Sequence, residues 1–256
     1  MQGAVVEYNG SMATTTTLPE TPGIEYLEKS ELFKGLDRAA LLEVARAGRK
    51  RSVRAGGHFF RQGDRAAAQY ILLEGSVKLT QITPEGHQVL LRVAGPGEVF
   101  AAIAVLEDAR YPVTAQATTP CRALAWDTAS MLDLMSRYPE LAINALRVMA
   151  RRVQEFQDRY RELATERVEQ RIARALTRLA RQAGRRTGDG VLIDLALTRQ
   201  DIAEMTGTTR FTISRTLAEW EQRGIVSVGR ERIIITQPHA LVTIAEDLPR
   251  GADEGM

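Results

Sequence analysis

The stretch Leu197-Thr-Arg-Gln-Asp-Ile-Ala-Glu-Met-Thr-Gly-Thr-Thr-Arg-Phe-Thr-Ile-Ser-Arg-Thr-Leu-Ala-Glu-Trp220 decides the fold of the C-terminal part of the chain. It predicts a short helix over residues 200–205 with Thr198 as its N-cap, because a threonine oxygen can accept from the first free backbone amides. Gly207 then permits a tight turn, since glycine tolerates backbone angles that other residues avoid. A second helix follows, with Thr209 as its N-cap.

Three residues in this stretch have the spacing of a helix-turn-helix. They are the small Ala203, the turn Gly207 and an inward Ile213, at successive steps of four and six residues. Beyond them, the segment 225–236 reads as two apolar strands joined by the turn Gly229-Arg-Glu-Arg232, which predicts a β-hairpin wing. We therefore expect a winged helix-turn-helix domain over residues 166–245.

Polar side chains on the second helix predict DNA binding. A helix fits the major groove, where Arg215 and Arg210 could each donate two hydrogen bonds to guanine O6 and N7. The start of the first helix suits phosphate contacts, which fix register without reading sequence. The predicted DNA-binding residues are Thr198, Arg199, Gln200, Thr209, Arg210, Phe211, Thr212, Ser214 and Arg215. The alternative is that this domain makes protein contacts only.

A long helix is predicted upstream, beginning at Pro139. Apolar residues recur there at alternating steps of four and three, which is the pattern that two helices share in a coiled coil. The first is Ala142, and the predicted dimer seam is Leu146, Met149, Val153, Phe156, Tyr160 and Leu163. The opposite face is polar, so we expect a dimerisation helix over 138–165 and a homodimer that binds a two-fold-related operator in double-stranded DNA. The alternative is a helix that packs on its own domain.

A further helix is expected over about 166–183, with one face rich in arginine. That face carries Arg167, Arg171, Arg174, Arg178 and Arg181. A loop over 184–190 is expected to follow it.

Residues 52–126 predict a compact antiparallel β-domain. Short alternating or β-branched segments, such as Val77-Lys-Leu79, are separated by glycine turns at regular intervals. We expect an effector-sensing β-roll domain over 24–137, between a flexible leader over 1–23 and the downstream helices. A flexible tail is expected over 246–256, and the fold class is α+β.

The composition of the chain excludes several classes of protein. The chain has 256 residues, 44% of them hydrophobic and 26% charged, which excludes global disorder. It contains no apolar run of about 18 residues and no secretory signal, so we expect a cytoplasmic protein that does not contact membranes. The single Cys121 excludes a disulfide or a cysteine-based metal or iron–sulfur site within the chain. No metal site, no catalytic residue and no enzymatic activity are predicted, because no catalytic constellation appears.

The order of β-roll, long helix and winged helix-turn-helix resembles the cyclic-AMP receptor protein/fumarate–nitrate regulator (CRP/FNR) family of bacterial transcription factors. The resemblance covers residues 26–240 and is most specific in Gly95-Pro-Gly-Glu-Val-Phe100 and in 197–217. It implies a homodimeric, effector-gated regulator of transcription with RNA polymerase as a partner. It also implies effector-binding residues in the roll, namely Gly97, Glu98, Phe100, Ala102, Arg110, Tyr111 and Thr114.

The chain departs from the cyclic-AMP-binding members at both positions that hold the nucleotide. Ala101-Ala102-Ile103 stands where they have Gly-Glu-Leu, and Tyr111 stands where an arginine grips the cyclic phosphate. We therefore do not expect cyclic AMP as the effector. A cyclic-nucleotide response through Arg110, or activity without a ligand, stays open as an alternative.

Segments 100–103 and 111–117 are most similar to the dissimilatory nitrate respiration regulators, a subgroup associated with nitric oxide sensing through haem. This similarity implies a redox or gas signal. It leaves the cofactor undetermined between haem and none, with His58 and His87 as the available ligands. Cys121 is expected to be a buried thiol. A regulatory ligand-binding module that acts through protein contacts is the second alternative.

The recognition helix departs from the family as well. Most members have Arg-Glu where this chain has Arg210-Phe211, so the glutamate that accepts from cytosine is missing. We expect a half-site that differs from the usual family consensus.

Overall fold

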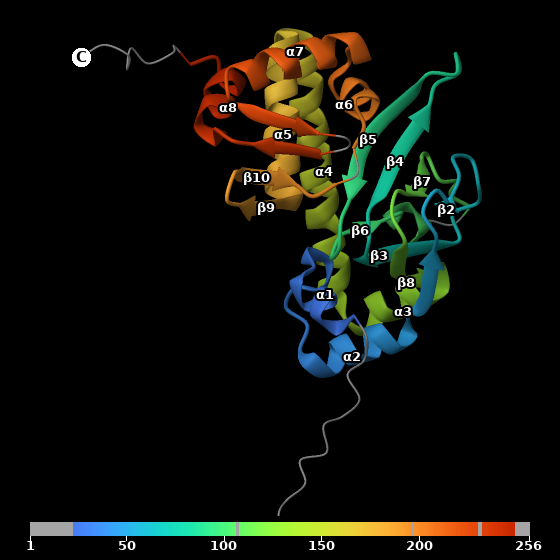
Figure 1. The fold of residues 1–256 in the computed structure, drawn as a ribbon. Coiled ribbons are helices and arrows are strands. Elements are labelled where there is room, and N and C mark those ends of the chain that lie inside the picture. The colour runs from blue at the N-terminus through green and yellow to red at the C-terminus, as the bar shows by residue number, and fades with distance from the viewer. Residues whose placement is uncertain (1–22, 106–107, 196, 230–231, 249–256) are drawn as a thin grey trace, which may run out of the picture.

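The computed structural model describes residues 23–105, 108–195, 197–229 and 232–248. The predicted leader, apart from Gly23, and the predicted tail beyond Leu248 lie outside the described residues. Within the described part, a β-roll and a C-terminal domain lie beside one long helix, α4 (Pro139–Thr165) (Figure 1). This arrangement agrees with the predicted α+β class.

The β-roll consists of two four-stranded antiparallel sheets, with strand orders β1-β8-β3-β6 and β2-β7-β4-β5. In chain order its strands are β1 (Arg49–Val53), β2 (His58–Phe60), β3 (Ala68–Glu74), β4 (Val77–Ile82), β5 (Gln88–Ala94), β6 (Val99–Phe100), β7 (Thr114–Ala117) and β8 (Cys121–Asp127). A short 3-10 turn, η2 (Ala102–Val105), follows β6. Aromatic side chains fill the space between the sheets, because alternate residues of each strand point inward.

Helices close one end of the roll and connect it to α4. They are α1 (Ile24–Lys29), the 3-10 turn η1 (Glu31–Phe33), α2 (Arg38–Ala47) and α3 (Thr128–Arg137). Helix α4 is tied to this layer by Asn144, whose buried amide donates to the carbonyl oxygens of Leu32 at 3.1 Å and Lys34 at 2.7 Å. The N-terminal part of α4 is therefore fixed on the helices that close the β-roll.

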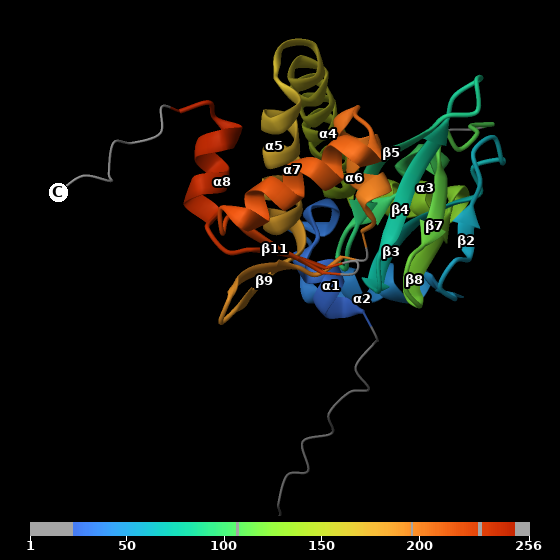
Figure 2. The ribbon, with the colours of Figure 1, turned by 45° about the horizontal axis from the view of Figure 1, so that its top comes forward.

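The C-terminal domain contains four helices and a third sheet of order β11-β12-β10-β9. Its elements are α5 (Val168–Ala183), β9 (Gly184–Thr187), β10 (Gly190–Ile193), α6 (Arg199–Thr206), α7 (Arg210–Gln222), β11 (Val226–Gly229), β12 (Arg232–Ile235) and α8 (Pro238–Ala245). Figure 2 shows α7 and α6 on the outside of this domain, with α6 beside β4 and β5 of the roll.

Two details differ from the sequence predictions. The expected loop over 184–190 is wrong, because Gly184–Thr187 forms strand β9 and turns at Gly188-Asp189 into β10. A Gly-Asp turn between short strands is a hairpin signal, but the polar residues of this edge strand hid it. The second detail lies at the start of the predicted flexible tail, where two exposed residues have ion-pair partners. Glu246 pairs with Arg174 at 2.9 Å, and Asp247 pairs with Arg167.

Candidate nucleic-acid interface

The turn between α6 and α7 has the predicted local geometry. Thr198 caps α6 by accepting from the Asp201 amide at 3.2 Å, and Asp201 in turn accepts from the Thr198 amide at 2.6 Å. Gly207 has the left-handed backbone angles φ 60° and ψ 45°, which favour glycine. Thr209 caps α7 by accepting from the Thr212 amide at 3.1 Å. Both helix starts are therefore fixed by side chains that the sequence identified.

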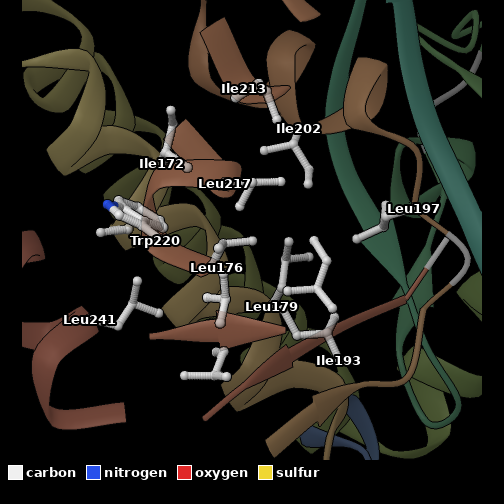
Figure 3. Close-up of a cluster of buried hydrophobic side chains, with 14 of the residues drawn as sticks. Ile172, Leu176, Leu179, Ile193, Leu197, Ile202, Ile213, Leu217, Trp220 and Leu241 are labelled. Carbon is white, nitrogen blue, oxygen red and sulfur yellow. The ribbon is translucent and has the colours of Figure 1, made fainter. Parts of the chain in front are cut away.

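The inner face of α7 anchors it to the domain core (Figure 3). Ile213, Leu217 and Trp220 are fully buried against α5 and the sheet. The Trp220 indole nitrogen also donates to a Glu169 carboxylate oxygen at 3.0 Å, which satisfies its one polar atom. Because the inner face is locked, the outer face of α7 has a fixed direction.

The predicted DNA-binding residues lie on the outer surface of α6 and α7. Seven of the nine are exposed, including Phe211, whose side chain is 75% exposed. The other two, Thr212 and Ser214, are half-buried. Arg210 and Ser214 are four residues apart, as are Phe211 and Arg215, so they form adjacent rows on one helix face. The hydroxyls of Thr198 and Thr209 are already used as caps, which leaves them a smaller part in any DNA contact.

Three arginines of this surface have free guanidinium groups. Among the described residues, no carboxylate oxygen lies within 4.0 Å of Arg199, Arg210 or Arg215. A guanidinium group without an internal partner keeps its donors for phosphate or base-edge oxygens. The surface is thus polar, positive and built on a rigid helix.

A contact that sequence reasoning missed holds this domain against the roll. The ammonium group of Lys78 on β4 lies 2.5 Å from the Asp201 carboxylate on α6, and the two side chains are only 15% and 8% exposed. Gln88 donates to Glu204 at 3.3 Å nearby, and Leu90 joins the buried core of the C-terminal domain. The sequence shows Lys78 as a polar residue of an alternating strand, and nothing near it in the chain indicates a partner 123 residues away.

The predicted dimer seam on α4 is uncovered in the single chain. Its members are between 50% and 72% exposed, namely Leu146, Met149, Val153, Phe156, Tyr160 and Leu163. Ile143, which the heptad pattern omitted, is 50% exposed on the same helix. The other side of α4 contacts the roll and α5 through charged groups, such as Glu162, which lies 2.6 Å from Arg178. The helix therefore does not bury its apolar stripe in its own domain.

The predicted effector residues have different surroundings in the described part of the chain. Glu98 points away from the roll interior and lies 2.5 Å from Arg92, while its other oxygen accepts from Gln182 of α5 at 2.7 Å. Gly97 makes a turn with φ 84° and Ala102 begins the 3-10 turn η2. Arg110 is exposed and donates to the Gly63 carbonyl oxygen at 2.7 Å. Thr114 accepts from the Gln62 amide at 3.0 Å.

Phe100 and Tyr111 belong to the packed core of the roll. The Tyr111 ring stacks on Phe60 with centroids 3.7 Å apart, and Phe100 lies 5.2 Å from both Phe59 and Tyr70. The Tyr111 hydroxyl donates to the Ala68 carbonyl oxygen at 2.6 Å and accepts from its amide at 2.9 Å. Tyrosine thus fills the place where an arginine would face a ligand, with its own polar atom satisfied.

The two histidines that the sequence offers as haem ligands lie outside the packed interior of the roll. His58 is half-buried, and its Nδ1 lies 3.4 Å from the Arg61 guanidinium; burial, and then that charge, lower its pKa. His87 is exposed at the β4–β5 turn. The aromatic core described above occupies the interior. Cys121 is buried as predicted, with its thiol donating to the carbonyl oxygens of Ser76 and Thr119, and burial raises its pKa.

Among the described residues, none of the helices combines the length and the apolar character that a bilayer span requires. Likewise, no group of three or more His, Cys, Asp or Glu side chains in those ranges is placed to hold a metal ion.

Comparison with known proteins matches both halves of the chain. Residues 50–138 match the cyclic nucleotide-binding domain, and residues 170–244 match the Crp-like helix-turn-helix domain. The CRP-like cAMP-activated global transcriptional regulator of Mycobacterium tuberculosis is 25% identical over 217 residues, covering 85% of this chain and 97% of that protein. The global nitrogen regulator of a Nostoc species is 30% identical over 186 residues, covering 71% and 82%.

A solved structure gives the same arrangement. A transcriptional regulator of the CRP family from Thermus thermophilus superposes with a TM-score of 0.66 at 25% identity, over 77% of this chain and 96% of that one. Both matched domains coincide with the regions where the sequence predicts a β-roll and a helix-turn-helix.

Proposed function

The chain belongs to the CRP/FNR family of DNA-binding transcription regulators, and we propose that it acts as a homodimer that reads a two-fold-related operator under the control of a signal in its β-roll. The observation that carries this proposal is the surface of α7, where Arg210 and Arg215 are exposed and have no carboxylate partner among the residues that the structure describes. Its relatives are transcriptional regulators rather than enzymes.

We infer that α7 enters the major groove and reads bases with its outer face. Arg215 and Arg210 supply two-pronged donors that suit guanine O6 and N7, while Phe211 supplies an apolar contact of the kind that recognises a thymine methyl group. Arg199 and Gln200 at the start of α6 face the phosphate backbone and fix the register. Specificity therefore comes from α7, and much of the affinity comes from the start of α6.

The homodimer is inferred from the uncovered stripe on α4. Six large apolar side chains in a coiled-coil pattern are at least half exposed, and a second copy of the same helix is the partner that such a pattern fits. Two copies of α7 would then lie on one face of the dimer, so that each meets one half-site.

The signal in the roll is inferred to be something other than cyclic AMP. Tyr111 is buried and bonded to the backbone of Ala68, so it presents no cation to a cyclic phosphate. Arg110 donates to Gly63 at the outside of the roll. We propose a redox or gas signal, as the similarity to the dissimilatory nitrate respiration regulators implies. This part is tested by titration with cyclic AMP, for which no heat of binding is expected, and by the absorption spectrum of protein purified from its own cells.

We propose that the signal reaches the DNA-binding domain through the hairpin β4–β5. Lys78 and Gln88 of that hairpin contact Asp201 and Glu204 of α6, so a displacement of the hairpin changes the position of the helix-turn-helix. Coupling of this kind requires two arrangements of the roll and the DNA-binding domain that differ in their affinity for the effector. RNA polymerase is the proposed protein partner, and the cytoplasm, where bacterial chromosomes lie, is the proposed location.

The DNA-binding proposal is tested by binding-site selection followed by fluorescence anisotropy on the selected duplex. Arg215→Ala should weaken binding to the selected site by about 1–3 kcal/mol and relax its specificity. Arg186→Ala removes the same charge from the exposed strand β9 and is the matched control. No enrichment of any sequence, or equal losses for Arg215→Ala and Arg186→Ala, would overturn the proposal.

A further inference from the structure

A cavity between the roll, α4 and the C-terminal domain contains arginines that the proposed function does not use. This interdomain cavity has a volume of about 620 Å³ and is lined from β5, α4, α5 and α8 by eight arginines and five carboxylates. It lies outside the roll interior and away from the outer face of α7. The arginine face that the sequence predicts on α5 contributes Arg174, Arg178 and Arg181 to it.

Most of these arginines already have an acidic partner. Among the described residues, six of the eight have a carboxylate oxygen within 4.0 Å, as in Arg92 with Glu98 at 2.5 Å and Arg178 with Glu162 at 2.6 Å. The two exceptions in that part of the chain are Arg159 on α4 and Arg181 on α5. Eight arginines against five carboxylates leave the lining with three more positive than negative charges, and the partner of Arg151 is Glu31, which lies outside the lining.

Three arginines that line the interdomain cavity have guanidinium donors with no acceptor among the described residues, namely Arg159, Arg178 and Arg181. Arg159 is half-buried, and its one hydrogen bond in the described part of the chain goes to the Leu91 carbonyl oxygen. Burial, and then the charge of Arg178, lower its pKa. The Nε–H of Arg178 is buried and has no acceptor among the described residues. Arg181 follows Arg178 by three residues, so the two share a face of α5. Burying a hydrogen-bond donor or a cation without a partner costs free energy, and a bound anion would reduce this cost by accepting from the donor and neutralising the charge.

We propose that the interdomain cavity binds a small phosphate-type anion with at least two negative charges, held by Arg159, Arg178 and Arg181. Guanidinium groups suit phosphate because their paired donors match its oxygens. The volume lies within the range of ordinary ligand pockets, which accommodates a pyrophosphate or a nucleoside polyphosphate. Such an anion would bridge α4 and α5, and thus the long helix and the DNA-binding domain. The binding itself does not depend on the proposed reading of DNA.

Isothermal titration calorimetry of the full chain with pyrophosphate, without DNA and at constant ionic strength, tests this site. Binding should weaken at least about tenfold in Arg181→Gln and in Arg159→Gln, because each loses a charge-assisted contact. Arg186→Gln on β9 should bind as the original protein does. Arg181 is exposed, so its replacement leaves the fold intact even if Arg159→Gln does not fold. A parallel titration with ATP separates the sources: tighter binding indicates a nucleotide, and equal binding indicates a free polyphosphate.

Three results would overturn the proposal. The first is the absence of heat with both pyrophosphate and ATP. The second is unchanged affinity in Arg181→Gln. The third is a loss in Arg215→Gln without a loss in Arg181→Gln, which would assign the anion to the DNA-binding surface.

Discussion

Replacing Phe156 by aspartate should dissociate the proposed dimer. The Phe156 side chain is 68% exposed on α4, so a partner helix can cover about two-thirds of it. Full burial of a phenylalanine stabilises by about 1.5–3 kcal/mol, which gives about 1–2 kcal/mol for this side chain. A two-fold seam contains the residue twice, so the dimer loses about 2–4 kcal/mol. The dissociation constant should therefore rise by about 30- to 700-fold, before any repulsion between the two carboxylates is added.

Sedimentation equilibrium over a range of protein concentrations measures this change directly. Phe211→Asp is the matched control, because Phe211 is 75% exposed but lies on α7, away from the seam. We expect Phe156→Asp to shift to monomer while Phe211→Asp keeps the dissociation constant of the original protein. If Phe156→Asp sediments as an unchanged dimer, or if both variants dissociate equally, the seam on α4 is not the interface.

Four further predictions follow from particular contacts. Arg199→Ala should weaken binding to specific and random duplexes alike and reduce the slope of log affinity against log salt by about one, as measured by anisotropy at several salt concentrations; a loss confined to the specific site would contradict a phosphate contact. Phe211→Glu should change the base preference of the half-site in a selection experiment, and an identical selected sequence would refute its role in reading DNA. Lys78→Met should leave the buried Asp201 carboxylate with only its Thr198 contacts and destabilise the docked domain by about 1–3 kcal/mol. Amide hydrogen exchange in α6 should become faster in this variant but not in the control Lys50→Met. Equal protection of α6 in both variants would rule out the docking role. Cys121 should resist a thiol reagent at mildly alkaline pH until the protein unfolds, because burial raises its pKa, and rapid modification of the native protein would show that it is accessible.

The helix-turn-helix was predictable because its determinants are local. A cap, a left-handed turn and two inward side chains are each set by residues within a few positions of one another, and the structure has all of them at Thr198, Gly207, Ile213 and Leu217. The β-roll was predictable at the level of strands and turns for the same reason. Strand β9 was missed because its exposed Arg185 and Arg186 carry no alternation of apolar and polar residues.

The effector residues were not predictable to the same degree. The turn at Gly97 fixes the backbone, but the direction of Glu98 depends on Arg92 and on Gln182, which is 84 residues away in the chain. Likewise, the family resemblance aligns Tyr111 with the arginine that holds the cyclic phosphate, but it does not show that the Tyr111 hydroxyl donates to the Ala68 carbonyl oxygen. Sequence patterns give the place of a side chain on its element, whereas its partners come from other elements.

The long helix shows how the two kinds of information combine. Its apolar stripe follows from the heptad pattern, because spacing alone decides which residues share a face. The pattern does not determine what the polar residues on the opposite face of α4 contact, because such residues are equally consistent with solvent and with charged neighbours. In the structure that face carries Arg152, Arg159 and Glu162 against the roll and α5. A displacement of α4 at the proposed seam would therefore move these charged groups between the two domains, and we expect α4 to connect the proposed dimer interface with the interdomain cavity.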